Sequence, residues 1–197
     1  MAEMNPLARF FVNLSTGRRN RRRWAWLRGR LPRIPRAACL EIGCGNGDFA
    51  ALFLEGMSPE RYVATDLDPR QLEAARRHLA PRYPAGLPPA LELDEADMLE
   101  LPYPDAAFDY VFAFLAIHHA SPNHHDFSKV PTALGEVDRV LRPSGVLAYE
   151  EFVHKEPIRA WLRERGYAVV SEDRHWNRES LILRKPGPPS PSPPPAR

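Results

Sequence analysis

The sequence predicts an α/β fold in which helices cover both faces of a mostly parallel β-sheet. From Ala37 onward, apolar segments of strand length alternate with amphipathic segments of helix length. The first apolar segment runs directly into a glycine-rich turn at residues 43–47, and residues 108–115 form a near-continuous apolar run typical of a central strand. A chain of 197 residues with 44% hydrophobic content corresponds to one globular domain with tails.

The elements follow one another along the chain with recognisable stop signals. Pro143 and Gly145 are expected to end the helix before the fifth strand, and Gly166 follows the last helix. The last two strands are expected to form a hairpin-like edge, and the tail at 186–197, with seven prolines, is expected to be disordered. The predicted strands are 37–42, 61–65, 90–93, 108–115, 146–149, 167–172 and 180–184, and the predicted helices begin at 48, 69, 132 and 156.

Composition points to a reducing compartment. The only two cysteines, Cys39 and Cys44, have neither the number nor the spacing of a disulfide framework or a zinc site. No apolar run approaches the ~20 residues that span a bilayer, and the N-terminus has no pattern of a secretory signal. We therefore expect a cytoplasmic protein.

The turn after the first strand carries the clearest functional signal. It reads Glu-x-Gly-x-Gly-x-Gly from Glu41 to Gly47, whereas dinucleotide-binding domains use Gly-x-Gly-x-x-Gly. Such a turn exposes bare backbone to a ligand and points a helix N-terminus at it; the alternative is an ordinary tight turn. The pattern resembles the class I S-adenosylmethionine (SAM) dependent methyltransferases. The resemblance implies that Glu41 serves the methionine amino end of the cofactor and that Gly43, Cys44, Gly45 and Gly47 line its site.

Carboxylates after the next two strands match the same family. A carboxylate at Asp66 can accept both ribose hydroxyls, as in other adenosine-binding domains, and Asp68 is the competing acid or a cap for the next helix. By resemblance, Asp97 accepts from the adenine amino group and the backbone N–H of Met98 meets a ring nitrogen; the alternative for Asp97 is a helix N-cap. Leu67 and Met98 are expected to wall the adenine slot, and Phe114, at the end of the central strand, completes the predicted cofactor site.

Two longer sequence segments resemble one group within this family. Residues 101–109 are similar to the Leu-Pro-Phe-x-Asp-x-x-Phe-Asp run of the ubiquinone/menaquinone biosynthesis type of methyltransferase, the type 11 group. Residues 136–145 are similar to the run E-x-x-R-V-L-K-P-G-G, with Ser144 in place of a glycine, which we expect to be tolerated if position 144 keeps a negative φ. The resemblance covers residues 37–185. It implies a Rossmann-like sheet of seven strands, mostly parallel, with an antiparallel last strand.

The loop at 117–130 is expected to select the substrate, because open α/β sheets bind ligands at the carboxyl ends of their strands. It contains His118, His119, His124 and His125. Adjacent histidines do not readily share one ion, so no metal site is predicted. His118 or His119 is the candidate general base for an acceptor that must lose a proton, whereas His124 and His125 are equally well explained as solvated loop residues.

The class of methyl acceptor is inferred from a motif that is absent at the end of the fourth predicted strand. The Asn/Asp-Pro-Pro-Tyr/Phe signature of enzymes that methylate amino groups of nucleic acids and proteins is absent after residue 114, where the chain continues Leu-Ala-Ile-His. A small-molecule or lipid-like acceptor is therefore favoured and a nucleic acid is not. The sequence predicts neither the methylated atom nor the oligomeric state.

Residues 1–36 form a basic segment with ten arginines and one acid. Leu7, Phe10, Phe11 and Leu14 have the spacing of an apolar helical face. Three interpretations stay open: a helix packed over the cofactor cleft, a segment in peripheral contact with anionic lipid at a membrane, and a nucleic-acid-binding arm.

We therefore predict a SAM-dependent methyltransferase acting by in-line transfer, with residues 37–185 as its catalytic domain. The alternative is a catalytically silent SAM-binding module that acts through its basic arm on RNA, membrane or a protein partner. A nicotinamide oxidoreductase is disfavoured by the glycine spacing.

Overall fold

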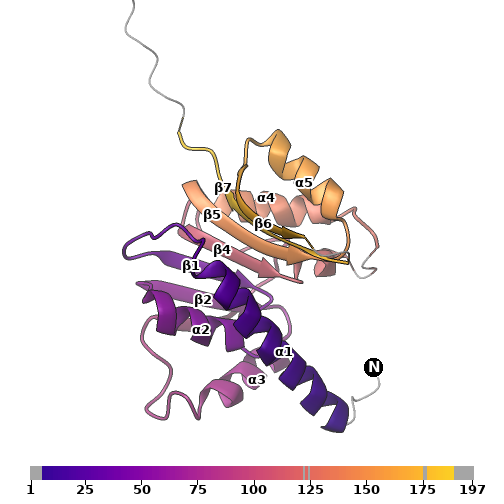
Figure 1. Ribbon diagram of the computed structural model, residues 1–197. Coiled ribbons are helices and arrows are strands. Elements are labelled where there is room, and N and C mark those ends of the chain that lie inside the picture. Colours follow the sequence, from indigo (N-terminus) through magenta and orange to yellow (C-terminus); the bar gives the residue numbers. More distant parts are fainter. Residues whose placement is uncertain (1–5, 122, 124, 175–176, 189–197) are drawn as a thin grey trace, which may run out of the picture.

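The computed structural model describes residues 6–121, 123, 125–174 and 177–188, without the side chains of residues 6–16. Helices and strands alternate as the sequence predicts (Figure 1). The elements are α1 (Pro6–Leu27), β1 (Ala38–Ile42), α2 (Asp48–Met57), β2 (Arg61–Asp66), α3 (Pro69–Leu79), β3 (Leu91–Glu95), β4 (Phe108–Phe114), the short 3-10 helix η1 (Ile117–Ala120), α4 (Val130–Val140), β5 (Leu141–Glu151), α5 (Lys155–Glu164), β6 (Ala168–Arg174) and β7 (Glu179–Arg184).

One sheet of seven strands organises the domain, in the order β3-β2-β1-β4-β5-β7-β6. Neighbouring strands from β3 to β5 pair in parallel, whereas β7 pairs antiparallel with both β5 and β6. The predicted mostly parallel sheet with an antiparallel last strand is confirmed. The order reverses at β1, so the carboxyl ends of β1 and β4 flank the crevice in which such sheets hold ligands.

Each face of the sheet has its own apolar core. Buried residues of α4 and α5, among them Leu134, Val137 and Ile158, pack on one face. Buried residues of α1, α2 and α3, among them Trp24 and Phe49, pack on the other. Burial on both faces explains why β4 is a nearly unbroken apolar run, since neither set of alternating side chains faces water.

Helix α1 belongs to the second core. The Trp24 ring packs edge-on against Phe49 and Phe53 of α2, with ring centroids 6.4 and 5.5 Å away, and Figure 1 shows α1 beside α2. Gly56 makes this contact feasible, because a methyl group there would clash with the Trp24 ring. Trp24, Leu27 and Leu31 are buried against the domain, as the first of the three interpretations of residues 1–36 expects. The side chains of the predicted apolar face, Leu7, Phe10, Phe11 and Leu14, lie outside the described ones. None of the described helices is long and apolar enough to cross a membrane.

Two local expectations differ from the structure. Helix α4 ends at Val140 and β5 begins at Leu141, so strand pairing starts before Pro143 rather than at residue 146. In the predicted tail, the carbonyl of Pro186 accepts from the backbone N–H of Ser144 at 3.2 Å. The rest of that tail, residues 189–197, lies outside the described residues, as do residues 1–5.

The condition under which Ser144 was expected to be tolerated, a negative φ, is not met. Ser144 has φ +63°, a left-handed conformation that crowds the Cβ atom of an L-residue against its own backbone. Ser144 therefore adopts a backbone conformation that a glycine would adopt without this crowding.

Ser144→Gly is expected to raise the free energy of unfolding by about 0.5–1 kcal/mol, because relief of the left-handed strain exceeds the extra chain entropy of glycine. Chemical denaturation measures this difference. Ser144→Ala is the control, since it removes the hydroxyl and keeps the Cβ atom. A gain in stability from alanine equal to that from glycine would contradict this explanation.

Candidate active site

The turn between β1 and α2 requires glycine at its first positions. Gly43 and Gly45 have φ values of +71° and +53°, which side chains disfavour. A Cβ atom on Gly43 would also lie 2.9 Å from the Cβ atom of Ala116, whereas the space beside Gly45 is open to 4 Å. The turn therefore packs tightly against the η1 side and leaves bare backbone accessible at Gly45, as a ligand-binding turn must.

A cavity of about 170 Å³ lies at this turn; here it is called the glycine-loop cavity. Its walls come from the turn, from the end of β4 and from α1, so the basic helix completes the site. The lining residues are Glu41, Gly43, Cys44, Gly45, Asn46, Phe114, Leu115, Arg19, Asn20 and Arg23. Gly47 lies behind the turn, where an added Cβ atom would meet Leu79 and Ala75 of α3.

Glu41 is a buried carboxyl group in the wall of the glycine-loop cavity. The Tyr62 hydroxyl donates to its Oε2 at 2.9 Å. Burial raises the pKa of Glu41 to about 8, and the Tyr62 hydrogen bond and the charge of Arg23 only partly oppose this shift. Near neutral pH this carboxyl group therefore holds a proton that a cationic ligand group would displace.

Asp66 ends β2 beside the turn. Its Oδ2 accepts from the backbone N–H of Gly45 at 3.0 Å, and its Oδ1 accepts from the N–H of Asp68 at 3.1 Å. Burial raises its pKa, against these backbone hydrogen bonds. Asp68 has the other predicted role: it is the N-cap of α3, where its Oδ1 accepts from Arg70 N–H at 3.0 Å. Only Asp66 is tied to the glycine turn.

The third predicted contact region follows β3. The backbone N–H of Ala96 bonds the carbonyl of Asp66 at 3.4 Å, which puts Asp97 and Met98 at the same edge of the sheet. Asp97 accepts from Leu99 N–H at 2.8 Å in a turn that pairs it with Glu100, so no helix begins there. Met98 is partly buried and Leu67 is 59% exposed. None of these residues is among those that line the glycine-loop cavity.

His118 is buried in η1 and is held by Glu151 at the end of β5. The Nδ1 of His118 lies 2.8 Å from Oε2 of Glu151, and the His118 backbone N–H donates to Oε1 at 3.3 Å. In the tautomer in which Nδ1 carries the hydrogen, Nδ1–H donates to Glu151 and Nε2 is the ring nitrogen with a lone pair. The exposed His119 ring lies 4.1 Å from the His118 ring, centroid to centroid.

The other loop histidines give no site. His124 lies outside the described residues, and His125 is an exposed loop residue. Within the part of the chain that the structure describes, no group of three His, Cys, Asp or Glu side chains is arranged to hold a metal ion.

A second buried pair was missed by the sequence reasoning. The Arg23 guanidinium of α1 bonds Glu150 of β5 at 3.0 Å, with side-chain exposures of 6% and 4%. It also stacks on the Phe114 ring, 4.3 Å from the centroid, and donates to Asn20. Successive residues of a strand face opposite sides, so Glu150 meets α1 on one face while Glu151 meets His118 on the other. Two adjacent acids at the end of an apolar strand were the available signal.

Comparison with known proteins identifies the family. Residues 40–149 match the family model described as a methyltransferase domain. Demethylmenaquinone methyltransferase of Thermus thermophilus is 39% identical over 113 residues, which cover 57% of this chain and 46% of that protein. Malonyl-[acyl-carrier protein] O-methyltransferase of Serratia marcescens is 34% identical over 146 residues, covering 73% and 48%. The chain spans about half the length of the curated relatives it matches.

Solved structures share the fold. The cyclase SpnF superposes with a TM-score of 0.69 at 18% identity, covering 85% of this chain and 82% of that one. A SAM-dependent methyltransferase from Aquifex aeolicus gives 0.61 at 15% identity, covering 78% and 85%. The family match and the similar solved structures together support SAM as the cofactor. The chain therefore belongs to the type 11 group of class I SAM-dependent methyltransferase domains.

Proposed function

We propose that this chain transfers a methyl group from SAM to a small-molecule or lipid-like acceptor. The observation that carries the proposal is the glycine-loop cavity, in which open backbone at Gly45 meets the buried acid Glu41 in a chain of this family. Its relatives are named for small-molecule or lipid acceptors, which supports the same acceptor class here.

The residues present fit the cofactor. Glu41 would receive the methionine amino group, the turn at Gly43, Cys44, Gly45 and Gly47 would carry the methionine portion with Phe114 as an apolar wall, and Asp66 would hold the ribose. Asp97, Met98 and Leu67 border the adenine. When bound, SAM would supply a methyl group on a cationic sulfur, with a neutral thioether as the leaving group. The chain contributes alignment, which alone supplies about 7–11 kcal/mol in well-oriented reactions.

Incorporation of label tests the proposal directly. The full chain is incubated with methyl-labelled SAM and a fractionated small-molecule extract, with heat-denatured protein as the blank. We expect label in at least one small-molecule fraction. Binding of SAM without label in any fraction would contradict transferase activity and favour the silent SAM-binding module.

Binding of S-adenosylhomocysteine, the product form of the cofactor, is expected to release a proton from Glu41. At pH 7 the free protein lies below the Glu41 pKa of about 8, so the carboxyl group is mostly protonated; a bound ammonium group favours its ionised form. Affinity is therefore expected to rise as the pH increases from about 6 to about 8.

Calorimetry in phosphate and Tris buffers measures this release, because the buffers take up protons with different enthalpies. Glu41→Gln is the matched variant that cannot release the proton. Equal binding enthalpies in both buffers for the unmodified chain would contradict the assignment of Glu41.

His118 is the proposed general base, oriented by Glu151. His118→Asn is expected to lower label incorporation by about 10²–10⁴-fold, the usual contribution of a positioned base, while the affinity for S-adenosylhomocysteine stays unchanged. His119→Asn is the comparison variant, since His119 is exposed to solvent whereas His118 is buried against Glu151. If His119→Asn lost incorporation and His118→Asn kept it, the base would be His119.

A further inference from the structure

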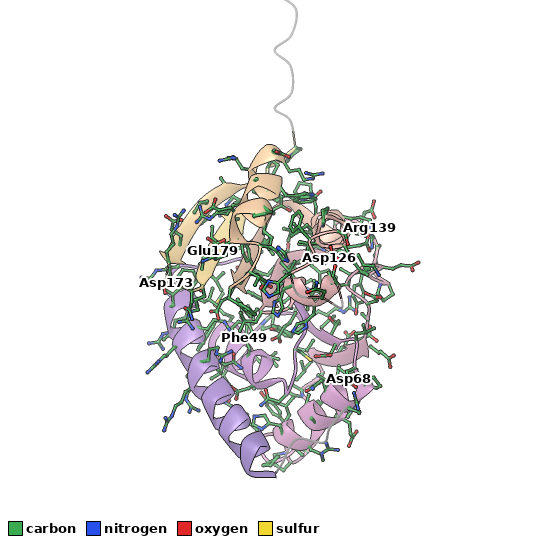
Figure 2. All side chains as sticks on the ribbon, turned by 90° about the vertical axis from the view of Figure 1, so that its right-hand side faces the viewer. Phe49, Asp68, Asp126, Arg139, Asp173 and Glu179 are labelled. Carbon is green, nitrogen blue, oxygen red and sulfur yellow. The ribbon has the colours of Figure 1, made fainter. Side chains whose placement is uncertain are left out.

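A second cavity adjoins the glycine-loop cavity and has a volume of about 500 Å³. It lies between α1 and the strands β5, β7 and β6, and Figure 2 shows Asp173 where the β6–β7 hairpin approaches α1. The two cavities share Arg19 and Arg23. We call it the arginine cavity; its lining residues are Arg18, Arg19, Arg22, Arg23, Trp26, Glu150, Asp173, Arg178 and Ser180. Small-molecule sites usually measure about 300–1,000 Å³.

The helical period places the basic side chains in this cavity. Arg18, Arg22 and Trp26 follow one another at intervals of four, and Arg19 and Arg23 form the adjacent stripe, so one face of α1 supplies five lining residues. Five arginines in all face two carboxylates, Glu150 and Asp173. The cavity therefore carries excess positive charge.

Most of that charge is available to a ligand. Glu150 is already engaged, since it bonds Arg23 at 3.0 Å and accepts from the Ser180 hydroxyl at 3.2 Å. Arg18, Arg19 and Arg22 form no ion pair with any residue that the structure describes. Guanidinium groups bind carboxylate and phosphate through paired N–H donors.

The floor of the cavity holds an unsatisfied donor. The Nε of Arg178 is buried and has no hydrogen-bond partner in the described part of the chain. The same side chain reaches Glu150 only at 3.9 Å, through Nη1. A buried N–H without a partner is unfavourable, and an anionic oxygen in the cavity would satisfy it. The half-buried Trp26 provides an apolar wall beside these donors.

We propose that the arginine cavity binds the methyl acceptor by an anionic group. The acceptor is then a small carboxylate or phosphate ester whose apolar body packs against Trp26, next to the proposed cofactor. This inference rests on the proposed function and names its substrate class. An extended polyanion fits less well, because it would meet Glu150 and Asp173 in the walls of a concave site.

Titration with simple probes tests the inference. Benzoate, phenyl phosphate and the neutral benzamide are titrated calorimetrically into the full chain saturated with S-adenosylhomocysteine. Arg18→Gln/Arg22→Gln removes two lining charges, and Arg21→Gln/Arg28→Gln removes two exposed charges of the same segment that do not line the cavity. We expect an anionic probe to bind with a Kd below about 1 mM and benzamide not to. The lining pair is expected to weaken that binding at least about tenfold, and the control pair to leave it unchanged.

Three results would overturn the inference: no binding of either anionic probe, equal binding of benzamide, or equal weakening by both variant pairs. Binding to vesicles of anionic phospholipid is measured as well. If the chain binds these vesicles tightly and both double variants lose that binding equally, the arginines contact a membrane surface instead. Failure of the proposed function is seen separately, as absence of S-adenosylhomocysteine binding in the first step. If only the lining pair weakens binding, tighter binding of phenyl phosphate indicates a phosphate ester as the acceptor, and tighter binding of benzoate indicates a carboxylate.

Discussion

Asp66→Ala is expected to weaken binding of S-adenosylhomocysteine at least about tenfold, because each charge-assisted hydrogen bond lost contributes about 1.5–3 kcal/mol. The carboxylate ends β2 and also accepts from the Gly45 N–H at 3.0 Å. Its removal therefore takes away the proposed ribose acceptor and loosens the turn that carries the methionine portion. Calorimetric titration of the folded variant measures the change.

Asp68→Ala is the matched control, two residues away. Asp68 caps α3 through Arg70 N–H, so the variant is expected to lose about 0.5–2 kcal/mol of stability and to keep its ligand affinity. Unchanged affinity in a well-folded Asp66→Ala protein, or an equal loss in Asp68→Ala, would remove Asp66 from the proposed site.

Arg23→Ala is expected to lower the free energy of unfolding by about 3–5 kcal/mol, because it leaves the buried Glu150 carboxylate without its main partner. The same change removes the stacking of the guanidinium on Phe114. Burial lowers the pKa of Arg23, and the charge of Glu150 opposes this shift. Chemical denaturation measures the loss.

Two further variants distinguish the loss of stability caused by breaking the Arg23–Glu150 ion pair from any loss caused by changing helix α1. Arg21→Ala, on an exposed position of α1, is expected to change stability by no more than about 0.5 kcal/mol. The double variant Arg23→Met/Glu150→Leu is expected to be far more stable than Arg23→Ala, since it removes the buried carboxylate together with its main partner. A loss as large as that of Arg23→Ala in the double variant would show that packing, not the unpaired carboxylate, sets the effect.

The fold could be predicted because its signals are local. The apolar run of β4, the Pro69 and Leu72 pattern of α3 and the glycines after β1 each reflect the geometry of a single element. The start of β5 could not, because the pairing of Leu141 with Phe108 depends on a strand more than 30 residues away. The positive φ of Ser144 could not be predicted from the residue itself, because L-residues such as serine disfavour the left-handed conformation.

The residues of the candidate site that could be predicted are those that belong to a single local feature, a turn or the end of a strand. Glu41 and the glycines after β1 follow from their spacing, and Asp66 from its place at a strand end. The pairs Arg23–Glu150 and His118–Glu151 join elements 127 and 33 residues apart in the chain. The face of β5 on which each acid lies depends on the register of the strand in the sheet, and the order of residues in the chain does not specify that register.

Calorimetric titration of the unmodified full chain with S-adenosylhomocysteine, beside NAD, tests the central claim most directly. The glycine-loop cavity with Glu41 in its wall, and Asp66 beside its turn, predict micromolar binding of S-adenosylhomocysteine and none of NAD. Binding of NAD alone, or of neither compound, would contradict the assignment of this turn as a SAM site.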